Sequence, residues 1–143
     1  MVRVLRSVYD AMIAHVLQTP ILESCGLLAG QGDTITRLFP TPNVSDNKAV
    51  RYEADPLDIR RILEEIDEAG LEHLGIYHSH PNSPAYPSAT DRRLAAYEVW
   101  YIVISLRVPK HPEARAFLIN KQHPGDETAE VVEEAIEVVE HAP

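Results

Sequence analysis

The 143 residues are enough for one domain with its own hydrophobic core, since 45% of them are hydrophobic. Seven of the 22 acidic residues lie from Asp126 onward, where no Lys or Arg occurs, so the net charge of −9 belongs mainly to the tail. The sequence shows no cluster of basic residues that would bind the phosphates of a nucleic acid. No window approaches the roughly 18 apolar residues of a membrane span, and the N-terminus lacks a signal peptide, so we expect a cytoplasmic protein that binds neither membrane nor nucleic acid.

Predicted strands and helices alternate through the first half of the chain. Residues 2–5 are expected to form a short strand and residues 7–18 an amphipathic helix. Two strands, residues 25–29 and 34–39, are expected to pair across the glycine-rich turn 30–33. Asp55 followed by Pro56 is typical of a helix start, and this helix should run to about Ala69, where Gly70 ends it.

The second half begins with the short apolar run 74–77, which predicts a buried strand. Prolines at 81, 84 and 87 turn the chain, and a helix is expected to begin at Ser88. Residues 98–106 should form a buried central strand with residues 114–119 as its neighbour. The spacing of apolar residues in the tail fits a helix, but its valines favour strands, so both remain open. We therefore predict an α/β domain, residues 1–125, with a mixed sheet flanked by helices. Residues 126–143 form an acidic extension that packs on or trails this domain.

The spacing of His78, His80 and Asp91 predicts a metal site. Residues two apart in a strand point to one face, so both imidazoles can aim at one point, and Asp91 lies in the first turn of the next helix. Two histidines and a carboxylate leave a fourth position for water, as in catalytic zinc sites. A closed structural site would need more cysteine than the single Cys25, which we expect to be a small buried hydrophobe. Ser88-x-x-Asp91 is also a helix-capping pattern, so capping alone could explain Asp91.

These residues resemble the JAMM motif of the JAB1/MPN/Mov34 metallopeptidases, His-x-His-x7-Ser-x2-Asp, without a gap or a substitution. Upstream, residues 23–30 are similar to the second hallmark of that family, a glutamate followed by x-Cys-Gly and an apolar strand. The resemblance covers about residues 2–119 and implies a single JAMM/MPN domain with a cytidine-deaminase-like architecture. Deaminase chemistry is not expected, because a chain with one cysteine lacks the Pro-Cys-x-x-Cys zinc ligands.

The resemblance also implies a role for each residue. His78, His80 and Asp91 would hold one zinc ion per chain. Glu23, which would otherwise be interpreted as an exposed loop residue, would take the proton of the zinc-bound water and pass it to the leaving amine. Ser88 would donate a hydrogen bond from its hydroxyl to the substrate carbonyl, while its backbone caps the helix.

By the same resemblance, the enzyme would hydrolyse the peptide or isopeptide bond after the C-terminal glycine of a ubiquitin-like or sulfur-carrier protein. The compact chain is most similar to stand-alone bacterial members that process sulfur carriers, so the leading hypothesis is release of cysteine, or a related amine, in sulfur metabolism. The substrate would be a carrier protein ending in Gly-Gly. Asn43, Arg51 and Tyr86 are candidate substrate contacts, supported only by their positions in loops.

Three alternatives remain open. A general isopeptidase would remove ubiquitin-like modifiers from lysine, and no residue excludes it. A non-catalytic MPN-type scaffold would use the fold for protein contacts, but such domains usually lose their metal ligands. A non-haem iron oxygenase also uses two histidines and a carboxylate, although the Glu23 motif argues against it. Assembly of the chain into a homo-oligomer is compatible with the sequence.

Overall fold

The computed structural model describes residues 1–143 and contains one mixed sheet and three helices. The strands are β1 (Val2–Leu5), β2 (Cys25–Gln31), β3 (Thr34–Thr41), β4 (Glu72–His80), β5 (Trp100–Ser105), β6 (Glu113–Asn120), β7 (Glu130–Glu134) and β8 (Ile136–Val139). The helices are α1 (Arg6–Leu17), α2 (Pro56–Glu68) and α3 (Ala89–Leu94). The sheet order is β7-β6-β5-β4-β2-β3-β1-β8, in which β1 runs parallel to β3 and β8, and β4 runs parallel to β5. The predicted α/β fold with a mixed sheet flanked by helices is confirmed.

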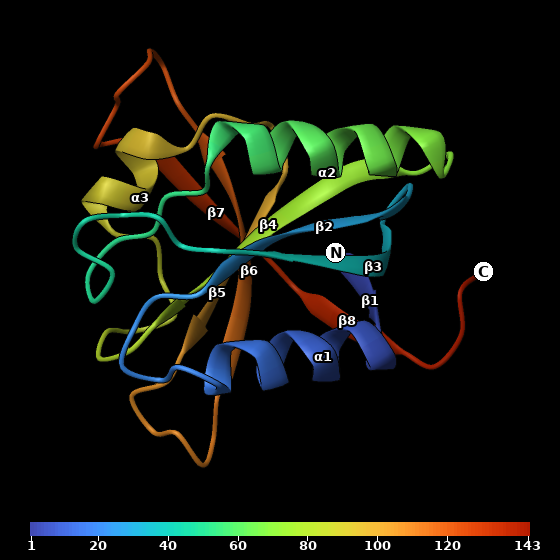
Figure 1. Ribbon diagram of the computed structural model, residues 1–143, viewed down its shortest axis with the longest axis horizontal. Coiled ribbons are helices and arrows are strands. Elements are labelled where there is room, and N and C mark those ends of the chain that lie inside the picture. Colours follow the sequence, from blue (N-terminus) through green and yellow to red (C-terminus); the bar gives the residue numbers. More distant parts are fainter.

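Helices α1 and α2 cover opposite faces of the sheet (Figure 1). The larger core cluster joins α1 to side chains such as Leu28 and Tyr77, and a smaller cluster joins α2 to Leu27 and Ile76. Successive residues of a strand point to opposite faces, so β2 and β4 each contribute to both clusters. Both faces of the sheet are therefore packed around the strands that lead to the histidines.

The close pairing of β2 with β4 depends on Gly26. A Cβ atom at this position would lie 2.4 Å from Cε1 of Tyr77, whose fully buried ring occupies that space. The Tyr77 hydroxyl in turn lies 2.7 Å from Nδ1 of His15 on α1. Gly26 thus lets the strands pair in the register that sets Cys25 opposite His78.

The acidic tail completes the sheet. Strand β7 pairs with β6 and β8 pairs with β1, although only Ala135 separates β7 from β8 in the chain. Because these are the two ends of the sheet order, the strands curl around α1 until both ends meet the same tail segment. Exposed ion pairs accompany this strand pairing, including Arg6 with Glu140 and Arg115 with Glu133. The valines of the tail therefore mark strands and not the helix that their spacing also fitted.

Several element boundaries differ from those predicted. Strand β4 continues from Tyr77 through His80, because neighbours on both sides satisfy its backbone: the Ser79 amide donates to the Ser24 carbonyl, and the His80 carbonyl accepts from Leu106. Strands β2 and β3 also run two residues longer than expected, and β5 begins at Trp100 rather than at residue 98. None of the three helices has the length and apolar character needed to cross a membrane.

Candidate metal centre

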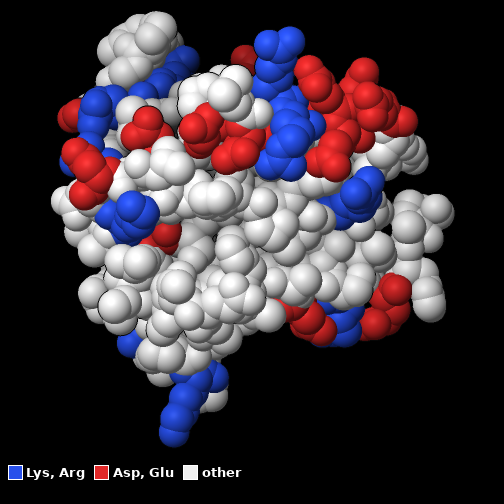
Figure 2. Space-filling view, viewed as in Figure 1, with Lys and Arg blue, Asp and Glu red and all other residues white.

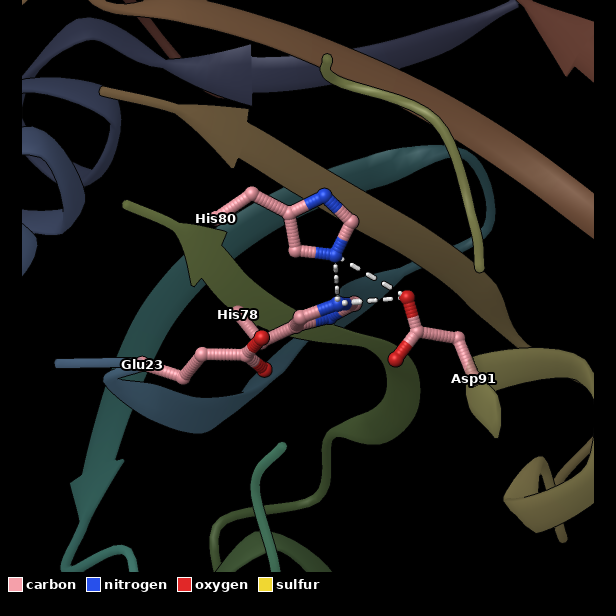
Figure 3. Close-up of side chains that lie close together, drawn as sticks. All are labelled: Glu23, His78, His80 and Asp91. Atoms are coloured by element: carbon pink, nitrogen blue, oxygen red, sulfur yellow. Dashed lines mark hydrogen bonds and ion pairs between the residues drawn. The ribbon is translucent and has the colours of Figure 1, made fainter. Parts of the chain in front are cut away.

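Four acidic and imidazole side chains meet at the carboxyl end of β4. His78 and His80 point to the α2 side of the sheet, as Ile76 does. Glu23 lies just before β2, two residues from Cys25 and four from Leu27, and so falls on that same side. Asp91 reaches the same point from α3 (Figure 3). The four side chains are only 1–7% exposed, and their ligand atoms all lie within 4.8 Å of one another. The structure therefore brings together the four residues singled out in the two sequence motifs.

The two histidines and Asp91 form a tight triangle of potential ligand atoms. Nε2 of His78 lies 3.1 Å from Nε2 of His80, and the two nitrogens lie 3.1 and 3.0 Å from Oδ2 of Asp91. Ligand atoms of a tetrahedral zinc with bonds of 2.0–2.1 Å stand about 3.3 Å apart, close to these separations. His80 donates from Nδ1 to the Pro84 carbonyl at 2.8 Å, so in the neutral ring its Nε2 presents a lone pair to the other two atoms. Such a convergence of lone pairs fits a bound cation.

Asp91 caps its helix and faces the histidines at the same time. Its amide donates to Oγ of Ser88 at 3.0 Å, and its Oδ2 accepts from the Ser88 amide at 2.9 Å. This reciprocal capping box fixes the carboxylate that contacts both imidazoles. Capping and metal binding are therefore compatible for Asp91. The expectation that only the backbone of Ser88 caps the helix is wrong, since its hydroxyl oxygen accepts the capping bond. The hydroxyl hydrogen remains free to donate.

Glu23 is held through its backbone and not through its carboxylate. Its amide donates to the Lys48 carbonyl at 2.7 Å, and its carbonyl accepts from Nδ2 of Asn43 at 2.9 Å. The next residue, Ser24, exchanges hydrogen bonds with Ser79, the residue between the two histidines. Oε1 of Glu23 is buried and has no hydrogen-bond partner in the protein, so one oxygen of the carboxylate is free to take part in chemistry.

The charges of the centre are strongly coupled. Burial raises the pKa of Glu23 to about 7, and the neighbouring histidines offset part of this rise. Burial would also raise the pKa of Asp91, but His78, His80 and the Ser88 amide together hold it well below its ordinary value. Burial lowers the pKa of His80, yet its contacts with Asp91 outweigh this and raise it. The centre thus combines a firmly ionised carboxylate with a second one that can gain and lose a proton near neutral pH.

An apolar groove of about 820 Å³ lies beside the centre. Its base includes Cys25 and Ile76, and its walls include Ile59 of α2 and Leu94 of α3. Figure 2 shows charged side chains gathered along the α2 rim, with a largely uncharged surface below them. Cys25 itself is 1% exposed, and burial raises the pKa of its thiol to about 12, as expected of a small hydrophobic residue.

The candidate substrate contacts fall in different places. Arg51 lines the groove. Asn43 does not line it, and its side chain is engaged in hydrogen bonds within its own loop and to the Glu23 carbonyl. Tyr86 is 44% exposed and sets its ring edge against Phe117, outside the groove. The loop 40–52 was expected to form a wall of the substrate groove, and its last residue, Tyr52, does line the groove. The stacking of Tyr52 on His78 was not predicted, because only the folded loop brings the two rings together.

Comparison with known proteins identifies relatives over most of the chain. Residues 5–120 match the model of a family described as prokaryotic homologues of the JAB domain. A desampylase of Haloferax volcanii is 41% identical over 66% of this chain and 73% of its own length. A probable TtuB-protein conjugate cleaving protease of Thermus thermophilus is 36% identical over 89% of this chain and 80% of its own. A CysO-cysteine peptidase of Mycobacterium tuberculosis is 34% identical over 87% of both chains.

Solved structures share the fold. A protein from Desulfitobacterium hafniense is 34% identical, with a TM-score of 0.83 over 99% of this chain and 94% of that chain. A JAB1/MPN domain protein from Archaeoglobus fulgidus is 16% identical, with a TM-score of 0.58 over 97% of each chain. The second likeness concerns the fold alone.

Proposed function

The chain belongs to the family of prokaryotic homologues of the JAB domain, and we propose that it is a zinc metallopeptidase acting on ubiquitin-like or sulfur-carrier proteins. It would hydrolyse the bond that follows the carrier's C-terminal glycine. The convergence of Glu23, His78, His80 and Asp91 at one buried point supports this proposal most directly. The names of the relatives add the substrate class, since they denote peptidases and proteases of such carriers or their conjugates.

Each residue of the centre has a proposed task. Zinc held by His78, His80 and Asp91 would lower the pKa of a bound water to about 7 and polarise the scissile carbonyl. Glu23 takes the proton of the attacking water on its free carboxylate oxygen and passes it to the departing amine. Ser88 donates its remaining hydroxyl hydrogen to the carbonyl oxygen as negative charge develops there.

The groove suits the chain end of such a carrier. An extended segment lying along its apolar walls would bury its side chains there and direct its last residues toward the centre. Eleven of the 20 lining residues are hydrophobic, so the groove favours apolar side chains before the terminal glycines. Glycine at the reacting position would leave the most room for its carbonyl to approach the buried centre.

The leaving amine separates two forms of this function. Release of cysteine from a carrier is the leading form, as in the name of the mycobacterial relatives. Cleavage of a carrier from a protein lysine is the second form, and it is supported by the name of the Thermus relative, which denotes a protease that cleaves protein conjugates. A non-catalytic scaffold is disfavoured because all four residues of the centre are present and buried.

The direct test offers both bonds to the zinc-loaded protein. A small carrier ending in Gly-Gly is supplied with either a C-terminal cysteine or a lysine isopeptide, and the products are identified by mass. We expect cleavage immediately after the terminal glycine of at least one substrate, and loss of cleavage with retained zinc in Glu23→Gln. Cleavage of neither substrate would refute the proposed activity. Unimpaired turnover by Glu23→Gln would remove this residue from the mechanism. Metal analysis of the protein as purified is a separate check, and iron in place of zinc there would favour the oxygenase alternative.

A further inference from the structure

The two histidines of the centre are oriented by different means. A histidine that binds metal through one nitrogen normally donates a hydrogen bond from the other, which fixes the plane of its ring. His80 follows this pattern, with its Nδ1 at 2.8 Å from the Pro84 carbonyl. Nδ1 of His78 is buried and has no hydrogen-bond partner. The plane of the His78 ring is therefore not fixed by a hydrogen bond within the protein.

Tyr52 contacts the face of that ring. Its ring stacks on the imidazole of His78, with the ring centroids 4.3 Å apart and the planes inclined by 23°. The edge-on contact between His78 and His80, at 4.9 Å and 65°, is less parallel and comes from the same strand. Tyr52 is thus the aromatic side chain from outside β4 that limits rotation of the His78 ring.

Tyr52 is held in place by the loop that carries it. The side chain of Asn43 donates to the Arg51 carbonyl and accepts from the Glu53 amide, each at 3.0 Å. These are the residues on either side of Tyr52, and the Val44 amide adds a bond of 2.8 Å to the Glu53 carbonyl. The same Asn43 amide group also donates to the Glu23 carbonyl at 2.9 Å. One hydrogen-bond network centred on Asn43 therefore ties the loop that carries Tyr52 to the backbone of the proposed proton carrier.

We propose that Tyr52 is a positioning residue that orients His78 for metal binding through ring stacking, and that Asn43 fixes Tyr52 in that position. The inference rests on the metal site of the proposed function but not on its peptidase activity. It predicts that the aromatic ring matters for metal affinity and that the phenolic hydroxyl does not. Tyr52→Phe keeps the ring, whereas Tyr52→Leu keeps only a side chain of apolar character.

The experiment measures zinc affinity by competition with a chromophoric chelator, and ligand geometry by the visible absorption of the cobalt-substituted protein. Loss of a contact that orients a metal ligand typically weakens binding 10–100-fold, so we expect a loss of about that size for Tyr52→Leu, with an altered cobalt spectrum. Tyr52→Phe should match the wild type in both measurements. Tyr97→Leu is the matched control, because Tyr97 also lines the groove and its ring contacts His73 instead of His78.

Two results would overturn the inference. One is wild-type zinc affinity and an unchanged cobalt spectrum in Tyr52→Leu. The other is equal weakening in Tyr52→Phe and Tyr52→Leu, which would assign the effect to the hydroxyl. Should Tyr52→Leu fail to fold, Asn43→Ser replaces it, and unchanged zinc affinity in that variant would refute the proposal. Tyr52-dependent zinc binding without cleavage of any carrier would leave the inference standing and refute only the peptidase.

Discussion

Replacing Gly26 by alanine tests whether the close approach of β2 and β4 builds the centre. The new Cβ would lie 2.4, 2.5 and 2.6 Å from three atoms at the end of the Tyr77 ring, well inside van der Waals contact. The ring is fully buried and cannot swing into solvent, so it must shift within the core. Such overpacking costs roughly 1–3 kcal/mol, and losing the contact between Tyr77 and His15 costs about 1 kcal/mol more.

We therefore expect Gly26→Ala to lower the free energy of unfolding by about 2–4 kcal/mol, measured by urea denaturation of the metal-free protein. Activity should fall as well, because Gly26 pairs with Tyr77 immediately beside the pair Cys25 and His78. A shift of the Tyr77 backbone would therefore move His78. A double-mutant cycle identifies the cause: in a Tyr77→Leu background the alanine should cost much less, since the colliding ring atoms are gone. An equal cost in both backgrounds would refute the steric argument.

Three further predictions concern the centre and the helix beneath the sheet. Changing both His78 and His80 to alanine should abolish stoichiometric zinc binding in metal analysis, and retained zinc would disprove the ligand assignment. Ser88→Ala should cost about 1 kcal/mol of stability through the lost cap, whereas Ser88→Gly should cost only a few tenths. Both variants should lose about 100-fold in kcat if the hydroxyl stabilises the carbonyl oxygen. A loss of kcat in Ser88→Ala but not in Ser88→Gly, in line with their stabilities, would show that Ser88 acts only as a helix cap. Burial lowers the pKa of His15, so protonation of its imidazole favours the unfolded chain. The stability that neutral His15 contributes is therefore complete above the unfolded pKa of about 6.5 and is lost as pH falls below that value. The melting temperature should therefore fall less steeply between pH 7.5 and 5.0 for His15→Gln than for the wild type. An equal fall in both proteins would exclude His15 as the cause of the acid destabilisation.

Local patterns in the sequence were enough to predict the family, the fold class and the peptidase class, and all three are confirmed. The meeting of His78 with His80 follows from the two-residue period of one strand, and Asp91 follows from a helix start that the prolines force nearby. Their assignment as metal ligands stays a proposal, as do the roles of Glu23 and Ser88.

Contacts that form only when separate segments of the chain meet in the fold were not predictable from local patterns. The tail carries an apolar spacing compatible with a helix or a strand, and only pairing with β6 on one side and β1 on the other decides between them. The stacking of Tyr52 on His78 likewise requires the loop that Asn43 closes. No periodicity marks such a loop, because several of its backbone groups bond to the Asn43 side chain and none belongs to a strand ladder.

The two supports of the centre differ in how they should respond to mutation. His78 and His80 stand on β4, which is paired on both sides and packed on both faces, so damage there costs global stability. Glu23 and Tyr52 depend on a surface loop whose bonds converge on Asn43. A change in that loop can shift the proton carrier and the stacked ring together while leaving the sheet intact. Loss of activity with an unchanged unfolding free energy is therefore the expected signature of loop variants, and loss of both is the signature of variants in β2 and β4.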